Sequence, residues 1–262
     1  MPRERTFRTE GLILRRIDFG EADRLLTLYT REHGKIRAIA KGARKPQSRK
    51  TGHVELFMRT RFLVAKGKSL DIITQAELVE TYPPLRNDLV RATYASYAVE
   101  LLDRLTPEDD PHPEIFNLLA NAFGWFSGDG ELLLAARYYE LRLLSLVGYQ
   151  PQLFRCVVTG EPIEEVDQFL SAELGGLISP GHRGHDRRSQ PISAVAVKVL
   201  RYLQTRSWDT VRVLQLRRPL QAELEGLMHA YLTYILERNL KSVDFLRRLR
   251  EEAALFAPDP EE

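Results

Sequence analysis

The residues best suited to binding chemistry are cations concentrated in one short stretch. Residues 33–54 include seven lysines and arginines and no aspartate or glutamate. They are densest from Lys41 to Lys50, where Gly, Pro and Ser favour turns. Such a segment repels itself and is stabilised by a polyanion, because each neutralised phosphate releases condensed counterions. The pattern is typical of phosphate binding, although a loop kept basic for solubility accounts for the charge alone equally well.

The charge of the whole chain is unevenly distributed. Residues 1–80 hold 18 Lys and Arg against 10 Asp and Glu, whereas the remaining 182 residues hold 20 against 26. The formal net charge of only +2 hides this difference. A basic front joined to an acidic remainder is typical of a polyanion-binding module fused to a different domain.

Motifs of enzyme chemistry are missing from the sequence. It has no Gly-x-Ser-x-Gly elbow, Walker loop or Gly-x-Gly-x-x-Gly fingerprint, and Cys156 has no histidine close by in sequence. Glu21 and Asp23 lie close together but lack a second acidic cluster, so we interpret them as turn residues. We therefore predict that the protein is not an enzyme, and a metal-dependent nuclease in particular lacks its carboxylates.

A metal site is the subtler question. Structural zinc is commonly held by paired Cys-x-x-Cys knuckles. Two pairs of positions have this spacing, and their occupants are Cys156, Thr159, Ser179 and His182. Thr and Ser are poor zinc ligands, and even with His185 only three good donors are available. We predict no metal and no cofactor, with these positions forming a degenerate knuckle.

The basic stretch lies among segments that predict β-strands. Apolar runs and period-two alternation mark residues 6–17, 24–30, 35–41, 54–65 and 70–79. Lys66-Gly67-Lys68-Ser69 is a hairpin signal between the last two. Five short strands in about eighty residues predict a closed barrel, and the OB-fold is the economical choice. The pattern leaves an SH3-like barrel open.

Aromatic residues accompany the cations of this predicted barrel. They are Phe7, Phe19, Tyr29, Phe57 and Phe62. Small barrels bind single strands by stacking bases on aromatics within a charged groove. Most of these rings must fill the core, so we expect one or two at most to be exposed.

Helical periodicity begins after Pro83-Pro84. Apolar residues at steps of three and four predict helices over residues 85–105, 114–127, 131–147, 194–206, 220–239 and 243–254, with 131–147 buried. The fold class is therefore α+β, with an OB-fold DNA-binding domain over 1–80 and a helical domain over 81–262. An irregular knuckle-like insert occupies 149–192. No apolar run could span a bilayer, and the single cysteine fits a reducing compartment, so we expect a cytoplasmic protein.

Several motifs resemble the bacterial RecO family. The most specific are Gly20-Glu-Ala-Asp23 and Ala40-Lys41-Gly42-Ala43-Arg44-Lys45, in the order and spacing of that family's N-terminal barrel. Leu146-Val-Gly148 and Arg238-Asn-Leu-Lys241 are similar to its helical domain. The resemblance covers most of the chain.

The resemblance implies a recombination mediator. Members bind single- and double-stranded DNA, anneal complementary strands, engage the single-stranded-DNA-binding protein SSB and, with RecR, help load RecA. This implies a cytoplasmic, nucleoid-associated protein that acts in repair of DNA damage. The family's fold is an OB barrel followed by a helical domain with a four-cysteine zinc knuckle. Three of those four positions are not cysteine here, so zinc is not carried over.

We predict that cations of the barrel contact DNA. The set is Arg15, Arg16, Arg24, Lys35, Arg37, Lys41, Arg44, Lys45, Arg49, Lys50, Arg59 and Arg61. Phosphate contacts give affinity without sequence preference. The alternative is an interaction scaffold that recruits repair proteins without touching DNA, and DNA binding by the barrel separates the two.

Overall fold

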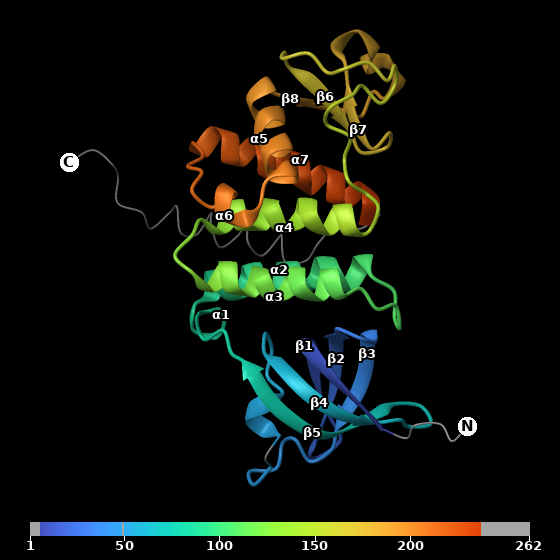
Figure 1. Cartoon of the computed structure of the whole chain (residues 1–262), viewed down its shortest axis with the longest axis vertical. Helices are drawn as coiled ribbons and strands as arrows, with labels where there is room; N and C mark the ends of the chain where they lie inside the picture. The colour runs from blue at the N-terminus through green and yellow to red at the C-terminus, as the bar shows by residue number, and fades with distance from the viewer. Residues whose placement is uncertain (1–5, 49, 237–262) are drawn as a thin grey trace, which may run out of the picture. The chain divides into compact units, whose positions relative to one another are not determined.

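The computed structural model describes residues 6–48 and 50–236. Its chain divides into two compact units, Met1–Gly128 and Asp129–Glu262. The first unit holds a barrel and the three helices that follow it (Figure 1). The predicted domain boundary after residue 80 falls within this unit, at the end of the barrel, and stays a prediction.

Five strands close into the barrel. They are β1 (Thr6–Phe19), β2 (Asp23–Thr30), β3 (Gly34–Ala40), β4 (Arg59–Ala65) and β5 (Asp71–Glu80), arranged in the order β1-β2-β3-β5-β4. All pairings are antiparallel except β3 with β5, which spans two register pairs, Ala38 with Asp71 and Ile39 with Ile72. This is the strand order of the OB-fold, so the predicted barrel is confirmed and the SH3-like alternative is removed.

The barrel is filled by side chains that alternate inward along the strands. Leu26, Leu28 and Phe62 are almost fully buried, together with Ile13, Ile36, Ala38, Val64 and Ile73. The predicted β4–β5 turn is confirmed, and it requires glycine at position 67. A Cβ there would lie 1.8 Å from the carbonyl oxygen of Leu70.

Three helices complete the first unit: α1 (Pro84–Asn87), α2 (Leu89–Leu105) and α3 (Pro113–Ser127). The Asp88 side chain caps α2 by accepting the N–H of Arg91 at 3.0 Å. Phe123 of α3 packs edge-on against Phe57 and Tyr82, with ring centroids 5.6 and 5.5 Å apart. Aromatic packing thus joins the helices to the chain on either side of β4 and β5.

Between residues 129 and 236, the second unit combines four α-helices with a small sheet. The helices are α4 (Leu132–Leu146), α5 (Ala194–Thr205), α6 (Trp208–Val211) and α7 (Arg218–Leu236). As predicted, α4 is buried around most of its circumference. The predicted helix over 243–254, and residues 237–239 of the one before it, lie outside the described residues. None of the helices described between residues 6 and 236 is long and apolar enough to cross a membrane.

The insert between α4 and α5 is more ordered than its sequence indicates. Its strands β6 (Gln168–Ser171), β7 (Gly176–Ile178) and β8 (Gln190–Ile192) form one sheet in the order β7-β6-β8. The 3-10 helix η2 (Pro180–His185) links β7 to β8. The sequence predicts an irregular knuckle-like insert here, and the third strand, β8, instead joins the region into one sheet.

Candidate nucleic-acid interface

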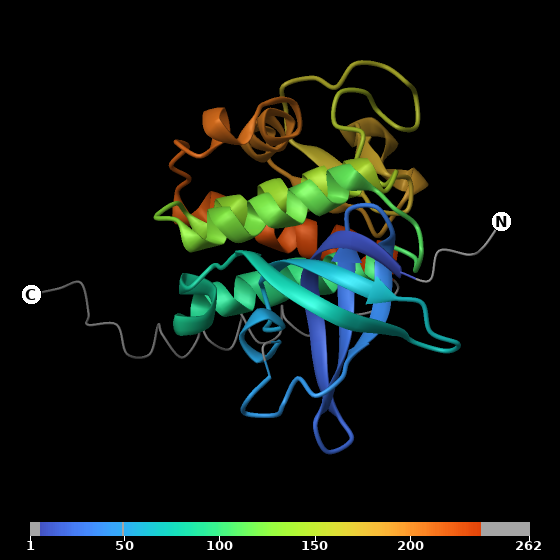
Figure 2. The same ribbon diagram turned by 60° about the horizontal axis from the view of Figure 1, so that its bottom comes forward.

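The basic loop between β3 and β4 is fastened to the turn between β1 and β2. The carboxylate of Asp23 accepts the backbone N–H of Gly42 at 2.7 Å, and the N–H of Arg44 donates to the carbonyl of Ala22 at 2.8 Å. Gly42 has a φ of 66°, a conformation that glycine adopts at little cost. Figure 2 shows the β1–β2 turn extending beyond the barrel beside this loop.

The loop itself is a succession of turns. Backbone N–H groups of Ala43, Lys45 and Ser48 donate to carbonyls three residues earlier, over 3.3, 3.1 and 2.9 Å. Ala43 is fully buried and anchors the loop to the core, whereas Lys41, Arg44 and Lys45 are exposed. The loop thus presents its cations from a defined backbone. Arg49, also predicted to bind DNA, lies outside the described residues.

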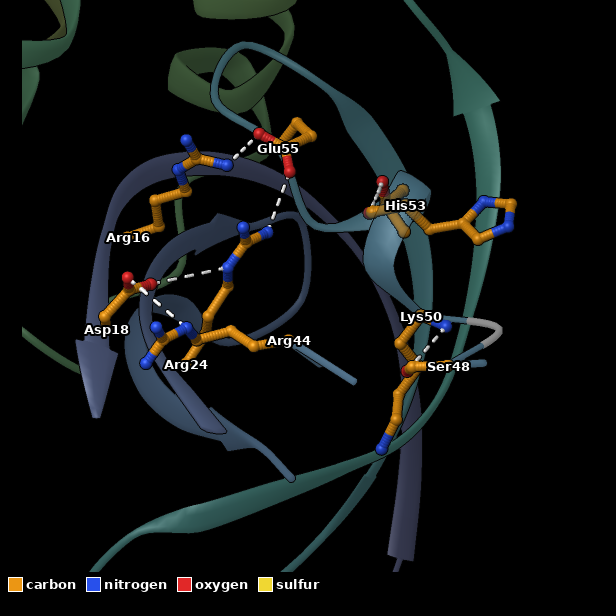
Figure 3. Close-up of polar contacts among 9 residues, drawn as sticks. Arg16, Asp18, Arg24, Arg44, Ser48, Lys50, His53 and Glu55 are labelled. Atoms are coloured by element: carbon orange, nitrogen blue, oxygen red, sulfur yellow. Dashed lines mark hydrogen bonds and ion pairs between the residues drawn. The ribbon is translucent and has the colours of Figure 1, made fainter. Parts of the chain in front are cut away.

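Three arginines surround two carboxylates beside this loop, and we call them the arginine cluster: Arg16, Arg24 and Arg44 (Figure 3). Glu55 pairs with Arg16 and, at 2.7 Å, with Arg24. Asp18 lies 3.6 Å from Arg24 and 3.4 Å from Arg44. Burial lowers the pKa of Arg16, the charge of Arg24 lowers it further, and Asp18 opposes the change. The cluster therefore unites two strands and the loop in one ion-pair network.

This network suits oxyanion recognition. A guanidinium presents a planar fork of donors that fits carboxylate and phosphate alike. Carboxylates hold the arginines in place, and a phosphate would take up the same donors. Asp18 and Glu55 were not among the predicted site residues. Glu55 carried one signal, since it is the first acidic residue after the acid-free stretch.

Two of the predicted lysines lie differently from the loop cations. Lys50 points away from the arginine cluster (Figure 3), and its ammonium donates to the carbonyl of Ile73 on β5 at 3.1 Å. Burial lowers the pKa of Lys50, and the charge of Asp23 opposes this. Lys35 is enclosed, with 9% of its side chain exposed, and donates to the carbonyls of Asp103 and Thr106 at 2.6 and 2.7 Å. Lys35 therefore links β3 to the end of α2, and we leave it out of the surface proposed below.

The remaining arginines of the set are spread around the barrel. Arg15 pairs with Asp103 at 2.5 Å. Arg59 pairs with Glu10 and lies over the ring of Phe116, 5.8 Å from its centroid. Exposed Arg61 pairs with Glu77 at 3.3 Å, on β4 and β5. The structure therefore does not bring the eleven described cations of the set onto one surface.

Among the described cations of the predicted set, two are exposed and carry no bonded partner. Within residues 6–48 and 50–236, the side chains of Arg37 and Lys41 make no hydrogen bond or ion pair. Arg37 lies on β3, and Lys41 follows the last residue of that strand. Both are available to an incoming anion without giving up a carboxylate.

One barrel aromatic is about half exposed, in line with the expectation of one or two exposed rings. Phe19, at the end of β1, keeps 49% of its surface accessible, and Ile17 before it keeps 59%. Tyr29, Phe57 and Phe62 are buried, and Phe7 is partly covered. Phe19 is one of five barrel aromatics in the sequence, where nothing distinguishes it from the others, and no sequence pattern marks Ile17 as exposed.

The knuckle positions do not form a zinc site. Thr159 accepts the N–H of Glu161 at 3.3 Å, and the thiol of Cys156 accepts the N–H of Ser179 at 3.4 Å. Only Cys156 and His182 offer donors that zinc prefers. Among the described residues, no three His, Cys, Asp or Glu side chains are grouped as a metal ion requires. The residues present therefore do not fit the metal that the family resemblance implies.

Comparison with known proteins decides the family. Residues 3–82 match the family described as Recombination protein O N terminal, and residues 86–244 match Recombination protein O C terminal. The DNA repair protein RecO of Roseiflexus sp. (strain RS-1) is 40% identical over 98% of this chain and 90% of its own. The RecO protein of Pelotomaculum thermopropionicum is 38% identical, over 95% of this chain and 96% of its own.

The chain belongs to the RecO family. Membership supports a role in DNA repair and recombination, with DNA and the recombination machinery as partners in general. The arginine cluster and the basic loop both lie in the part that matches the N-terminal RecO family.

Proposed function

We propose that this RecO-family protein binds single- and double-stranded DNA through its barrel and anneals complementary strands. With RecR, it helps to load RecA on SSB-coated DNA. The observation that carries the proposal is the fastening of the basic loop to the β1–β2 turn, which holds loop cations beside the arginine cluster. It acts in the cytoplasm at the nucleoid, where its substrate is.

The proposed phosphate contacts come from two kinds of cation. Arg37 and Lys41 are unpaired, whereas Arg16, Arg24 and Arg44 exchange carboxylates for phosphates, and Lys45 lies exposed on the same loop. Contact with four to six phosphates gives a salt slope of about −3 to −4 on single strands. Annealing follows because cations shared by two strands lower the repulsion between them.

The test is a DNA titration over a range of salt concentrations. The double variant Arg44→Ala/Lys45→Ala should bind DNA more weakly and reduce the salt slope by about one to two. The matched control is Lys66→Ala/Lys68→Ala, which removes the same charge from the β4–β5 turn of the same unit. Equal losses in both double variants would mean that net charge, not the loop, attracts DNA.

The partner proteins are tested separately. A peptide copy of the acidic SSB tail should be retained by the full chain, and RecR should co-purify with it. A full chain that retains these partners but does not bind DNA at low salt would instead support the scaffold alternative.

A further inference from the structure

An apolar pair is exposed on an ordered part of the barrel. Ile17 and Phe19 are both about half exposed or more, although the turn that follows them is fastened to the basic loop. Large apolar side chains gathered on a defined surface commonly mark a binding site. The arginine cluster does not account for this pair, because side chains alternate along β1 and place Arg16 and Asp18 on the opposite face.

The strand register extends this pair into a surface. Ile17 lies opposite Leu25 on β2, and Leu25 lies opposite Ile39 on β3. Directly opposed residues of antiparallel strands share a face, so these three lie in a row on the outside of the barrel, where Leu25 is partly exposed and Ile39 is largely covered, with 8% of its surface exposed. Phe19 follows two residues after Ile17 on the same face.

A second row, parallel to the first, is charged. Arg15 lies opposite Thr27, and Thr27 lies opposite Arg37. On the far side of the apolar row, Lys41 follows β3. We call this surface the outer face: Arg15, Ile17, Phe19, Leu25, Arg37 and Lys41.

The outer face is open only at one end. Towards the helices, Tyr29 is fully buried, and the carbonyl of Lys35 accepts the N–H of Asp109 at 3.0 Å. Residues 103–110 thus cover the Lys35 end of the sheet. The accessible part of the outer face therefore extends from Arg37 to Phe19.

The charges on this face favour an anion with apolar groups. Arg37 and Lys41 have no partner among residues 6–48 and 50–236, and Arg15 pairs with Asp103 alone. The acid nearest Phe19 in the register is Asp23, and its carboxylate is already bound by the N–H of Gly42. Unpaired nucleotides have the complementary chemistry, since their bases stack on apolar side chains while their phosphates meet cations.

We propose that the outer face binds the bases of unpaired nucleotides, with Phe19 as the stacking residue. The inference rests on the proposed DNA binding and adds a base-contacting site to its phosphate contacts. It also supplies a strand preference. In a duplex the bases are stacked on one another, so Phe19 gains contact only where nucleotides are unpaired.

The test uses the full chain and two ligands with equal numbers of phosphates. One is an ordinary single strand, and the other is an abasic strand of deoxyribose phosphates. Phe19→Ala should weaken binding of the ordinary strand about fivefold or more and leave the abasic strand and the duplex unchanged. The control Val90→Ala truncates an exposed apolar side chain on α2 of the same unit and should change neither.

A second variant reports the contact directly. Phe19→Trp should retain binding, and its fluorescence, after subtraction of the signal from Trp125 and Trp208, should be quenched by the ordinary strand but not by the abasic one. Equal weakening of both strands by Phe19→Ala would overturn base stacking while leaving DNA binding intact. If Phe19→Ala bound DNA like wild type but had a smaller oligomeric mass in solution, the outer face would be a self-association surface and the proposal would be wrong. Wild-type protein that binds no DNA at all would instead refute the proposed function.

Discussion

The side chain of Asp23 accepts the backbone N–H of Gly42 at 2.7 Å, so an acidic residue holds the basic loop in place. Nineteen residues separate them in sequence. The bond explains how a stretch with seven cations keeps a single backbone conformation. It also means that an acidic residue promotes anion binding, because it holds the cationic loop in position. Charge counting alone would assign Asp23 the opposite effect.

Asp23→Ala should therefore weaken DNA binding, although it removes a negative charge. Loss of the hydrogen bond should raise the free energy of ordering the loop by about 1 kcal/mol, which corresponds to about a fivefold loss of DNA affinity. Asp23→Asn keeps an acceptor oxygen and should bind DNA at least as tightly as wild type. Titrations of both variants at one salt concentration check this, and tighter binding by both would show that only charge matters.

Glu55→Gln should have the reverse effect. Glu55 occupies donors of Arg16 and Arg24, and an amide competes less with phosphate than a carboxylate does. Affinity for DNA should rise, and the salt slope should steepen by about 0.7 for each arginine that gains a phosphate. Glu77→Gln, which frees the separate Arg61, is the matched control. Weaker binding by Glu55→Gln alone would instead make Glu55 a positioning residue.

Lys35 and Lys41 should differ in what they support. Lys35→Met leaves the carbonyls of Asp103 and Thr106 without their ammonium donor, and it should destabilise the first unit by about 3 kcal/mol, while Asp103 keeps its pairing with Arg15. Lys41→Met should leave stability within about 0.5 kcal/mol of wild type and weaken DNA binding. Urea unfolding and DNA titration of both variants check the pair, and loss of DNA affinity in folded Lys35→Met would restore Lys35 to the interface.

Cys156 should make stability depend on pH. Burial disfavours its thiolate, but hydrogen bonds from Ser179 and from the backbone of Thr159 and Val158 outweigh this and lower the pKa to about 6 from 9.0. The folded state then holds a thiolate where the unfolded chain holds a proton, so stability rises from about pH 6 to about pH 9. Stability is lost as the pH falls through the folded-state pKa.

The measurement is urea unfolding of wild type and Cys156→Ser across that pH range. The free energy of unfolding of wild type relative to the variant should increase with pH. A constant difference would mean that Cys156 stays a thiol.

Local sequence patterns were enough to predict the barrel. The alternation of apolar and polar residues, the turn at Gly67 and the motif around Gly42 each depend on only a few neighbouring residues. These patterns were not enough for β4, which was predicted from residue 54 but begins at Arg59. Val54 and Met58 are buried but do not belong to a strand. A buried loop has the same apolar residues as a strand, so the sequence pattern could not tell the two apart. The strand β8 pairs with β6 across some twenty residues and has only three of its own, too few for a periodic signal.

The sequence predicted which cations the barrel carries, but it did not predict which of them lie together in the structure. Lys35 alternates with Arg37 and Lys41, so sequence placed all three together. The cover over Lys35 comes from residues 103–110, which no local pattern connects to β3. The carboxylates inside the arginine cluster were missed for the same reason, since Glu55 lies 39 and 31 residues from its two arginines.

The barrel closes between β3 and β5 through only two register pairs, and this makes that junction its weakest seam. Lys50 spans the adjoining part of β5 through the carbonyl of Ile73, at the far end of the basic loop. A ligand that restricts the motion of the basic loop should therefore also stabilise the pairing of β3 with β5. Amide hydrogen exchange at Ile72 and Ile73 should therefore slow when the loop is occupied, although neither residue belongs to the proposed DNA-binding set.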